Sequence, residues 1–253
     1  MCVDFESMRL DPKIIKAIEH LAYEEPTAIQ AQAIPLLLAG RDVIGQAKTG
    51  TGKTAAFVLP LLHRFDPDLR DIQGIVVTPT RELAIQVAKV TREFARFMRL
   101  RVLTIYGGQS YGKQIRRLQR GVDIVVGTPG RLLDLIHQDL LDLSAVRYAV
   151  LDEADEMLSM GFIEDVEAIL ERTPMHRQTA LFSATLPERI RHLASRYMRD
   201  PETVVVASPT RTVTKTAQRW FRVEPEQKFT ALLRVLGVEA VVKALIFART
   251  RVG

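Results

Sequence analysis

The chain has 253 residues, of which 47% are hydrophobic and 26% are charged, and this composition excludes disordered, collagen-like and low-complexity proteins. The single cysteine, Cys2, excludes an internal disulfide framework and a cysteine-rich zinc site. No segment approaches the roughly 20 apolar residues that a membrane span needs, and the N-terminus carries acids where a secretion signal is basic and then apolar. We therefore expect a cytoplasmic protein with no membrane partner.

The formal net charge of +5 favours polyanionic partners only weakly, but the charges are unevenly distributed along the chain. Residues 89–120 contain nine Lys/Arg and one acid, whereas residues 151–171 contain eight acids and no Lys/Arg. This contrast is typical of a surface that holds nucleic acid or phosphate beside a metal site. Solvated helix faces explain part of it, because Arg92, Arg96 and Arg99 lie opposite the apolar stripe of a predicted helix.

Short apolar runs alternate with helical patterns along most of the chain. Most of these runs are β-branched and apolar on both faces, as buried parallel strands are. In chain order, strands are predicted at 42–45, 74–78, 101–106, 123–126, 148–151, 179–182 and 203–206. Helices are predicted at 12–22, 30–39, 53–64, 81–98, 110–120, 130–138, 162–172 and 187–198. This alternation predicts an α/β fold with a mostly parallel sheet and helices on both faces.

The composition changes after the last of these strands. Residues 207–217 are rich in Ser and Thr and poor in large aliphatic residues, which predicts a linker. The remaining segment, 218–253, is too short to bury an independent core. It offers a possible strand at 218–223, a helix at 226–236 and an apolar strand at 244–247. We therefore predict a first domain over 1–206 and the incomplete start of a second domain over 218–253.

Several predicted strands are followed at once by small, polar or charged residues. Such residues occupy 45–48, 78–81, 127–130, 152–153 and 183–185. Loops are polar in general, but this does not explain why these loops hold phosphate-binding and carboxylate groups. Because ligands of open α/β sheets bind outside the carboxyl ends of the strands, we predict one extended site along that edge.

The strongest local pattern is the segment 47–54, which follows a predicted strand and opens a predicted helix. It has the layout of a phosphate-binding loop, although its first residue is Ala47 rather than Gly. Its backbone N–H groups and the helix N-terminus would face phosphate oxygens. Lys53 would reach the β- and γ-phosphates, and the Thr54 hydroxyl would bind Mg²⁺. The predicted nucleotide contacts of this loop are Thr49, Gly50, Thr51, Gly52, Lys53 and Thr54.

A second pattern, the acids Asp152 and Glu153, comes directly after the predicted strand at 148–151. A phosphate-loop ATPase needs a carboxylate at a neighbouring strand end to hold Mg²⁺, and often a second one to handle the attacking water. Adjacent acids also suit an exposed helix start, but the co-occurrence with segment 47–54 favours catalysis. We predict Lys53, Asp152 and Glu153 as catalytic residues and Thr54 and Asp152 as metal ligands.

With these two patterns the sequence resembles the DEAD-box RNA helicases, a family named for the residues that stand here at 152–155. The resemblance extends over essentially the whole chain, and the motifs occur in family order. Besides the two segments above, they are Phe5 with 25–30, then 79–84, 107–108, 128–131, 183–185 and 244–247. The resemblance implies a RecA-like P-loop NTPase fold, a Q motif over 5–30, and ATP and Mg²⁺ as cofactors. Ala47 is also the family's usual first residue of the phosphate loop.

The resemblance implies further roles around the nucleotide. Gln30 would read adenine through paired hydrogen bonds, and Thr27 would help to hold that loop. Tyr23 would stack on the ring and Phe5 would brace the pocket, although ordinary core packing explains both aromatics equally well. The coupling of the ATP state to domain closure would fall to Asp155, Ser183 and Thr185, unless the two hydroxyls only cap the end of a strand.

The resemblance also implies an RNA-binding strip on the same edge, made of helix starts and glycine amides that face phosphates. Such contacts read no bases, so little sequence specificity is expected, while contacts to 2′-hydroxyls would favour RNA over DNA. The residues concerned are Pro79, Thr80, Arg81, Gly107, Gly108, Thr128, Pro129, Gly130 and Arg131.

We therefore expect the N-terminal RecA-like domain of an ATP-dependent RNA helicase, which couples RNA-stimulated ATP hydrolysis to local duplex unwinding with a second RecA-like domain in cis. The family's later motifs should lie beyond Gly253, so this segment should bind nucleotide but be nearly inactive. Two alternatives stay open: an ATP-dependent RNA clamp or annealing protein, and another P-loop nucleic-acid motor, such as one directed by DNA.

Overall fold

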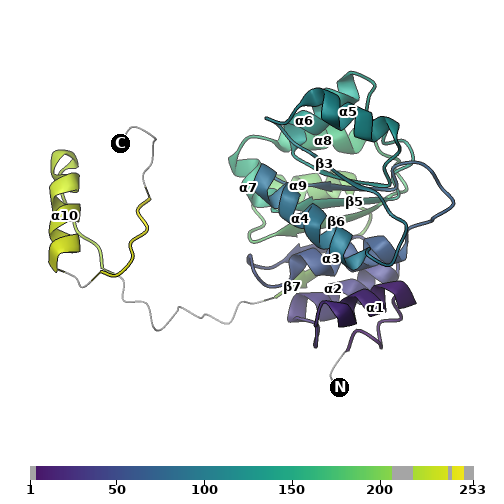
Figure 1. Cartoon of the computed structure of the whole chain (residues 1–253), viewed down its shortest axis with the longest axis horizontal. Helices are drawn as coiled ribbons and strands as arrows, with labels where there is room; N and C mark the ends of the chain where they lie inside the picture. Colours follow the sequence, from purple (N-terminus) through teal and green to yellow (C-terminus); the bar gives the residue numbers. More distant parts are fainter. Residues whose placement is uncertain (1–3, 207–218, 239–240, 248–253) are drawn as a thin grey trace. The chain divides into compact units, whose positions relative to one another are not determined.

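The computed structural model describes residues 4–206, 219–238 and 241–247, and the chain divides into two units, Met1–Ser208 and Pro209–Gly253 (Figure 1). The strands of the first unit are β1 (Val43–Gln46), β2 (Gly74–Val77), β3 (Val102–Ile105), β4 (Ile124–Gly127), β5 (Tyr148–Asp152), β6 (Gln178–Ser183) and β7 (Glu202–Val205). Its helices are α1 (Pro12–His20), α2 (Ala28–Leu38), α3 (Lys53–His63), α4 (Arg81–Phe94), α5 (Tyr111–Gln119), α6 (Pro129–His137), α7 (Ala154–Ser159), α8 (Ile163–Glu171) and α9 (Glu188–Tyr197).

The seven strands form one sheet in the order β3-β4-β2-β5-β6-β1-β7, and every neighbouring pair is parallel. Each strand predicted over residues 1–206 is present, with ends that differ by at most one residue, and the predicted α/β class is confirmed. Parallel strands run in one direction, so all their carboxyl ends meet at a single edge. The crossover helices therefore begin at that edge, where the polar loops of the sequence also lie.

Alternate residues along the strands enter two separate cores. In β2, Val76 packs in the cluster of α1, α2, α3 and α4, whereas Ile75 and Val77 pack in the cluster of α6, α7, α8 and α9. Tyr111, Ile115 and Leu118 of α5 pack against this second cluster. Figure 1 shows helices over both faces of the sheet. Burial on both faces explains why the strand sequences are continuously apolar.

Several details of the first unit differ from the sequence prediction. Helix α4 ends at Phe94 rather than at residue 98. Helix α2 begins at Ala28 rather than at residue 30, because the backbone N–H of Thr27 donates to Gln30 Oε1 at 2.9 Å and starts the helix two residues earlier. Helix α7 is absent from the prediction. Its six residues are too few to show a helical period in the sequence.

In the second unit the structure describes a 3₁₀ turn at Pro225–Gln227 and α10 (Lys228–Val238), close to the predicted helix at 226–236. The two predicted strands are wrong for the residues described, since 219–223 and 244–247 form no strand. A strand exists only when its backbone groups pair with a neighbour, and the described residues of this unit supply none. The predicted linker at 207–217 and Gln218 lie outside the described residues. No helix in the described ranges is long and apolar enough to cross a membrane.

Candidate functional site

The carboxyl edge of the sheet carries two neighbouring groups of polar loops. The adjacent strands β5, β6 and β1 lead into Asp152–Asp155, Ser183–Thr185 and the loop at 47–54. The adjacent strands β3, β4 and β2 lead into the predicted RNA-contacting segments. The loop at 47–54 and the acidic pair therefore meet at the same edge, separated by β6 alone. Two strand spacings amount to roughly 10 Å, which a bound triphosphate can bridge.

The loop at 47–54 has the backbone that phosphate binding requires. Gly50 and Gly52 adopt left-handed conformations with φ of 79° and 95°, and Thr51 Oγ1 donates to the Lys48 carbonyl at 2.8 Å. Gly52 is the N-cap of α3, whose first residue is Lys53. The unpaired N–H groups of this helix start give the loop a partial positive charge.

Lys53 and Asp152 place opposite charges at the bottom of this site. Lys53 is 6% exposed and Asp152 is 2% exposed. Lys53 Nζ and Asp152 Oδ1 are both buried without a hydrogen-bond partner. Burial raises the pKa of Asp152 to about 6, although the Lys53 ammonium opposes the shift. Buried polar groups in proteins are nearly always satisfied, so this unsatisfied pair indicates a place prepared for a ligand.

Glu153 occupies the turn between β5 and α7 in a left-handed conformation, with φ of 55° and ψ of 52°. A non-glycine residue rarely adopts this backbone, and the strain is of a size that functional sites sustain. The turn keeps Glu153 half-buried beside the buried Asp152. The two carboxyls thus have different environments, which suits two different tasks.

Asp155 is joined to the end of β6 by three hydrogen bonds. Its backbone N–H donates to Ser183 Oγ at 3.2 Å, and the backbone N–H and Oγ1 of Thr185 both donate to Asp155 Oδ2 at 2.9 Å. Burial raises the pKa of Asp155, but hydrogen bonding with Ser183 and Thr185 outweighs it, and the net pKa is lowered. Asp155 therefore contacts both Ser183 and Thr185, while the coupling role of these three residues stays a prediction.

Of the predicted adenine-side residues, Gln30 and Thr27 lie against the phosphate loop at Gly52. Gln30 Nε2 donates to the Gly52 carbonyl at 3.0 Å, and its Oε1 accepts from Thr27, so both ends of this buried amide are engaged. The Tyr23 ring lies edge-on to Phe5 and Phe94, with ring centroids 6.5 and 5.3 Å away. Phe5 is 4% exposed and Tyr23 is 39% exposed, so Tyr23 is the aromatic that solvent reaches. Contacts of these residues with adenine stay a prediction.

Hydrogen bonds and ring contacts within the chain hold the predicted RNA-contacting segments in place. Thr80 caps α4 by accepting from the Leu83 N–H at 3.2 Å, and Gly108 has a φ of 79°. The Arg81 guanidinium lies 4.9 Å from the centre of the Tyr106 ring, and Thr128 is the N-cap of α6. The predicted RNA-contacting residues thus line one stretch of the sheet edge, among them Pro79, Thr80, Gly107 and Gly130.

Arg131 and Gln114 form a support that sequence reasoning missed. Arg131 Nη1 donates to the Gln109 carbonyl at 3.3 Å and to Gln114 Oε1 at 3.2 Å. Gln114, which is 1% exposed, in turn donates to the Tyr106 carbonyl at 3.1 Å. Arg131 therefore holds the loop after β3, and a direct RNA contact by Arg131 stays a prediction.

Comparison with known proteins identifies the family. The sequence profile of the DEAD/DEAH box helicases matches residues 27–193, which is more than half of the chain. The chain belongs to the DEAD/DEAH box helicase family. It is 49% identical over 251 residues to the DEAD-box ATP-dependent RNA helicase CshA of Bacillus licheniformis, covering 99% of this chain and 52% of that protein. It is 50% identical over 248 residues to the RNA helicase CrhR of Synechocystis, covering 98% of this chain and 50% of that protein.

Solved structures agree with this assignment. A DEAD box protein from Methanococcus jannaschii superposes with a TM-score of 0.78 at 41% identity, over 92% of this chain and 63% of that one. The fold of this DEAD-box family member is therefore RecA-like, as the resemblance implied. The chain spans about half the length of the curated relatives that it matches.

A pair of glycine substitutions tests the loop geometry of this DEAD-box domain. A Cβ on Gly52 would lie 2.5 Å from Gln30 Nε2 and 2.7 Å from Thr27 Oγ1, whereas a Cβ on Gly50 would meet nothing within 4 Å. Both positions have positive φ, so each alanine costs about 1–2 kcal/mol of backbone strain. We expect Gly52→Ala to lower the melting temperature more than Gly50→Ala, because only Gly52→Ala disrupts the Gln30 contacts. Equal melting temperatures for the two variants would contradict this account of Gly52.

Proposed function

We propose that the full-length protein is an ATP-dependent RNA helicase of the cytoplasm, in which RNA-stimulated ATP hydrolysis drives local duplex separation. The observation that carries this proposal is that Lys53 Nζ, at the start of α3, and Asp152 Oδ1, at the end of β5, are both buried without a hydrogen-bond partner. A lysine and a carboxylate at these two positions of the sheet edge fit a triphosphate and its metal.

The residues present suit Mg²⁺ that arrives with the nucleotide. Among the described residues, no group of three or more His, Cys, Asp or Glu could hold a metal. Mg²⁺ is usually bound through one or two carboxylates together with substrate phosphates. Asp152 and the Thr54 hydroxyl would supply the protein ligands. The ion itself, when bound, neutralises charge on the phosphate oxygens.

Each site residue then has a distinct task in hydrolysis. The amides of 49–54 and the Lys53 ammonium bind the phosphates and stabilise the negative charge that develops on them. Glu153 orients the attacking water and accepts its proton. Gln30, fixed between Thr27 and the Gly52 carbonyl, links the base side of the pocket to the phosphate loop. Asp155 transmits the state of this site to Thr185 at the end of β6.

The loops after β2, β3 and β4 are proposed to bind the RNA backbone. The names of the relatives support RNA as the nucleic acid, since CshA and CrhR are both called RNA helicases. Helix starts and glycine amides contact phosphates rather than base edges, so RNA of any sequence should bind.

A second RecA-like domain in cis is proposed to begin at 218 after the linker at 207–217 and to complete the site. An arginine supplied by such a domain contributes about 10³–10⁵ in rate in related phosphoryl-transfer enzymes. The 253-residue chain alone should therefore bind ATP but hydrolyse it at least about a thousandfold more slowly than the full-length protein. Steady-state turnover of the two proteins measures this ratio, and equal rates would overturn the dependence on a second domain.

The proposed function is tested by the ATPase activity of the full-length protein with and without single-stranded RNA. We expect strong stimulation by RNA, weak stimulation by DNA of the same length, and strand separation in a single-turnover unwinding assay. Equal stimulation by DNA would indicate a different nucleic-acid motor. RNA binding and ATP hydrolysis without strand separation would indicate an RNA clamp or annealing protein.

A further inference from the structure

Helix α5 presents a stripe of four basic side chains on one face. Lys113, Arg116, Arg117 and Arg120 follow one another at steps of three, one and three residues, and all four are exposed. Residues at such spacing lie on the same side of a helix. The four side chains line a groove of about 280 Å³, which is also lined by Leu103 of β3, an edge strand of the sheet. We call this set the α5 stripe.

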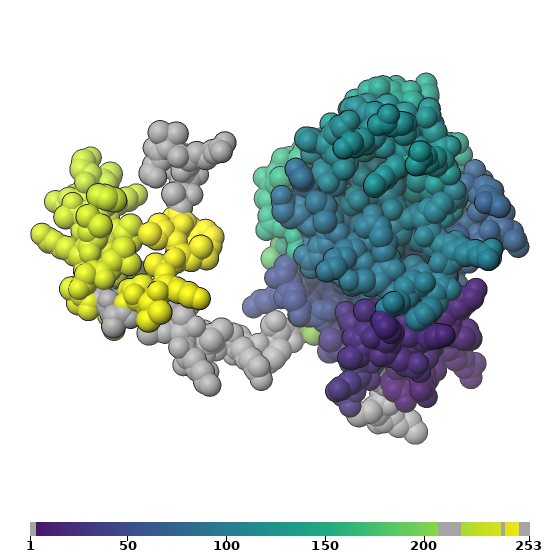
Figure 2. All heavy atoms as spheres, viewed as in Figure 1, coloured from purple at the N-terminus to yellow at the C-terminus, as the bar shows by residue number. Residues whose placement is uncertain are grey.

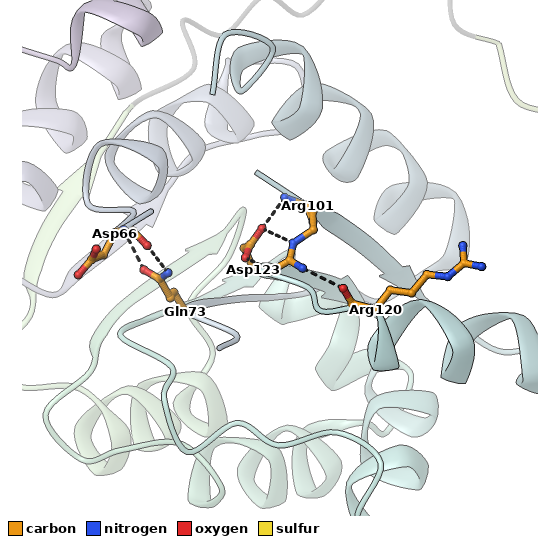
Figure 3. A network of polar contacts seen from close by, with 5 residues as sticks. All are labelled: Asp66, Gln73, Arg101, Arg120 and Asp123. Carbon is orange, nitrogen blue, oxygen red and sulfur yellow. Dashed lines mark hydrogen bonds and ion pairs between the residues drawn. The ribbon is translucent and has the colours of Figure 1, made fainter. Parts of the chain in front are cut away.

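Within the described residues, no acidic side chain forms an ion pair with the α5 stripe. The nearby carboxylate of Asp123 is already bound by Arg101, through Nη2 at 2.8 Å and Nε at 3.1 Å. Figure 3 shows the Arg120 backbone joined to Arg101, while the Arg120 guanidinium extends away from Asp123. The positive charge of the stripe is therefore left for an external partner.

A fifth cation increases this charge. Arg92 of α4 reaches the edge strand β3, where its Nη2 donates to the Val102 carbonyl at 3.1 Å. Burial lowers the pKa of Arg92, and the positive charge of Arg117 lowers it further. Two helices on opposite faces of the sheet thus bring like charges together at one edge. The segment that contains α4 and α5, blue to teal in Figure 2, lies at the surface of the first unit.

The basic residues of α9 show what an ordinary solvated face of this protein looks like. Arg189 is 2.8 Å from Glu164, and Arg196 is 3.2 Å from Glu171, so two of the three arginines of α9 are paired with acids of α8, and only Arg191 forms no ion pair among the described residues. Neutralised pairs of this kind suit a surface that meets only water. The α5 stripe lacks such pairs, and a solvated helix face does not account for that difference.

The position of the stripe identifies its partner. The loop after β3 carries Gly107 and Gly108, and α5 begins three residues later and runs back along the sheet. The stripe runs from Lys113 to the helix C-cap Arg120, seven steps of helix or about 10 Å, beyond one end of the RNA-binding strip. We propose that the α5 stripe binds phosphates of the RNA that extends past the strip, about three in number at about 3.4 Å per nucleotide. This proposal rests on the proposed RNA-binding function.

The test uses the full-length protein with Lys113, Arg116 and Arg120 all changed to Gln. A control protein carries Arg189, Arg191 and Arg196 changed to Gln, which removes the same charge from α9. Binding of triuridylate, which at about 3.4 Å per nucleotide matches the roughly 10 Å between the ends of β2 and β3, and of icosauridylate, which extends past the strip, is measured by fluorescence anisotropy at several salt concentrations. A third protein, with Arg116 and Arg120 changed to Lys, keeps the charge. Melting curves of all three variants verify that they are folded.

For icosauridylate, the α5 variant should lose about 2 from the slope of log affinity against log salt, since each of about three single-strand phosphates contributes about 0.7. Triuridylate binding, the α9 control and the lysine variant should match the unchanged protein. An unchanged slope for icosauridylate would overturn the proposal. It would indicate that the stripe binds an acidic protein partner or faces only solvent. An equal loss for both RNAs, or in the α9 control, would also overturn it. If the unchanged protein binds neither RNA, the proposed function itself fails.

Discussion

Changing Glu153 to Gln in the full-length protein should lower RNA-stimulated ATP turnover by about 10²–10⁴, the usual contribution of a positioned general base. The amide keeps the shape and the hydrogen-bonding reach of the side chain but cannot accept the proton of the attacking water. Binding of ATP and of RNA should persist, because the phosphates are held by the loop at 47–54 and by Lys53. The measurement is steady-state turnover together with the equilibrium affinities for both ligands.

Glu156→Gln is the matched control for this variant. Glu156 lies three residues further on, in the short helix α7 that Glu153 precedes, and its side chain is exposed. Its replacement removes the same charge and should leave turnover unchanged. If Glu153→Gln turned over ATP at the unaltered rate, Glu153 would have no part in activating water. If both variants lost activity alike, the effect would be one of charge rather than of position.

Changing Asp152 to Asn should stabilise the unliganded protein while it removes a proposed metal ligand. The folded-state pKa of Asp152 is raised from 3.8 to about 6, so the folded protein holds this proton more tightly than the unfolded chain does. Stability therefore decreases as pH rises from about 4 to about 6, where the buried carboxyl must ionise. Above that range the ionised group costs on the order of 3 kcal/mol, which an uncharged Asn avoids.

The prediction is measured by thermal unfolding of both proteins between pH 4 and pH 8. At pH 8 the Asn variant should melt at least several degrees higher, because 1 kcal/mol corresponds to roughly 2–4 °C for a chain of this size. At pH 4 the two melting temperatures should converge. A variant that is less stable than the unchanged protein at pH 8 would show that Asp152 supports the fold, contrary to the burial argument. Such a gain in stability at the expense of function is common at active sites.

The sequence predicted the sheet well because β2, β4, β5 and β6 are buried on both faces. Buried strands of this kind carry mostly apolar runs, and a polar group follows most of the strands at the carboxyl end. The order of the strands could not be read in the same way, since it depends on which runs pair across the chain. The strands predicted at 218–223 and 244–247 show this limit, because an apolar run becomes a strand only beside a partner.

The candidate site was predictable as far as its chemistry depends on local patterns. Lys53, Asp152 and Glu153 follow from the loop and the acidic pair, each next to a recognisable strand. The left-handed turn at Glu153 and the lack of partners for Lys53 Nζ are properties of the folded chain. Gln114 was missed because a buried amide on a basic helix has no pattern of its own, and its function is visible only in its contacts with Arg131.

The central claim is that the loop at 47–54 binds a triphosphate whose Mg²⁺ is shared with Asp152. The most direct measurement is the affinity for a non-hydrolysable ATP analogue, by calorimetry, with Mg²⁺ present and with Mg²⁺ removed by a chelator. The unchanged protein should bind the analogue much more tightly with Mg²⁺, and Asp152→Asn should lose most of that difference. An Asp152→Asn protein that gains as much from Mg²⁺ as the unchanged protein would contradict the claim.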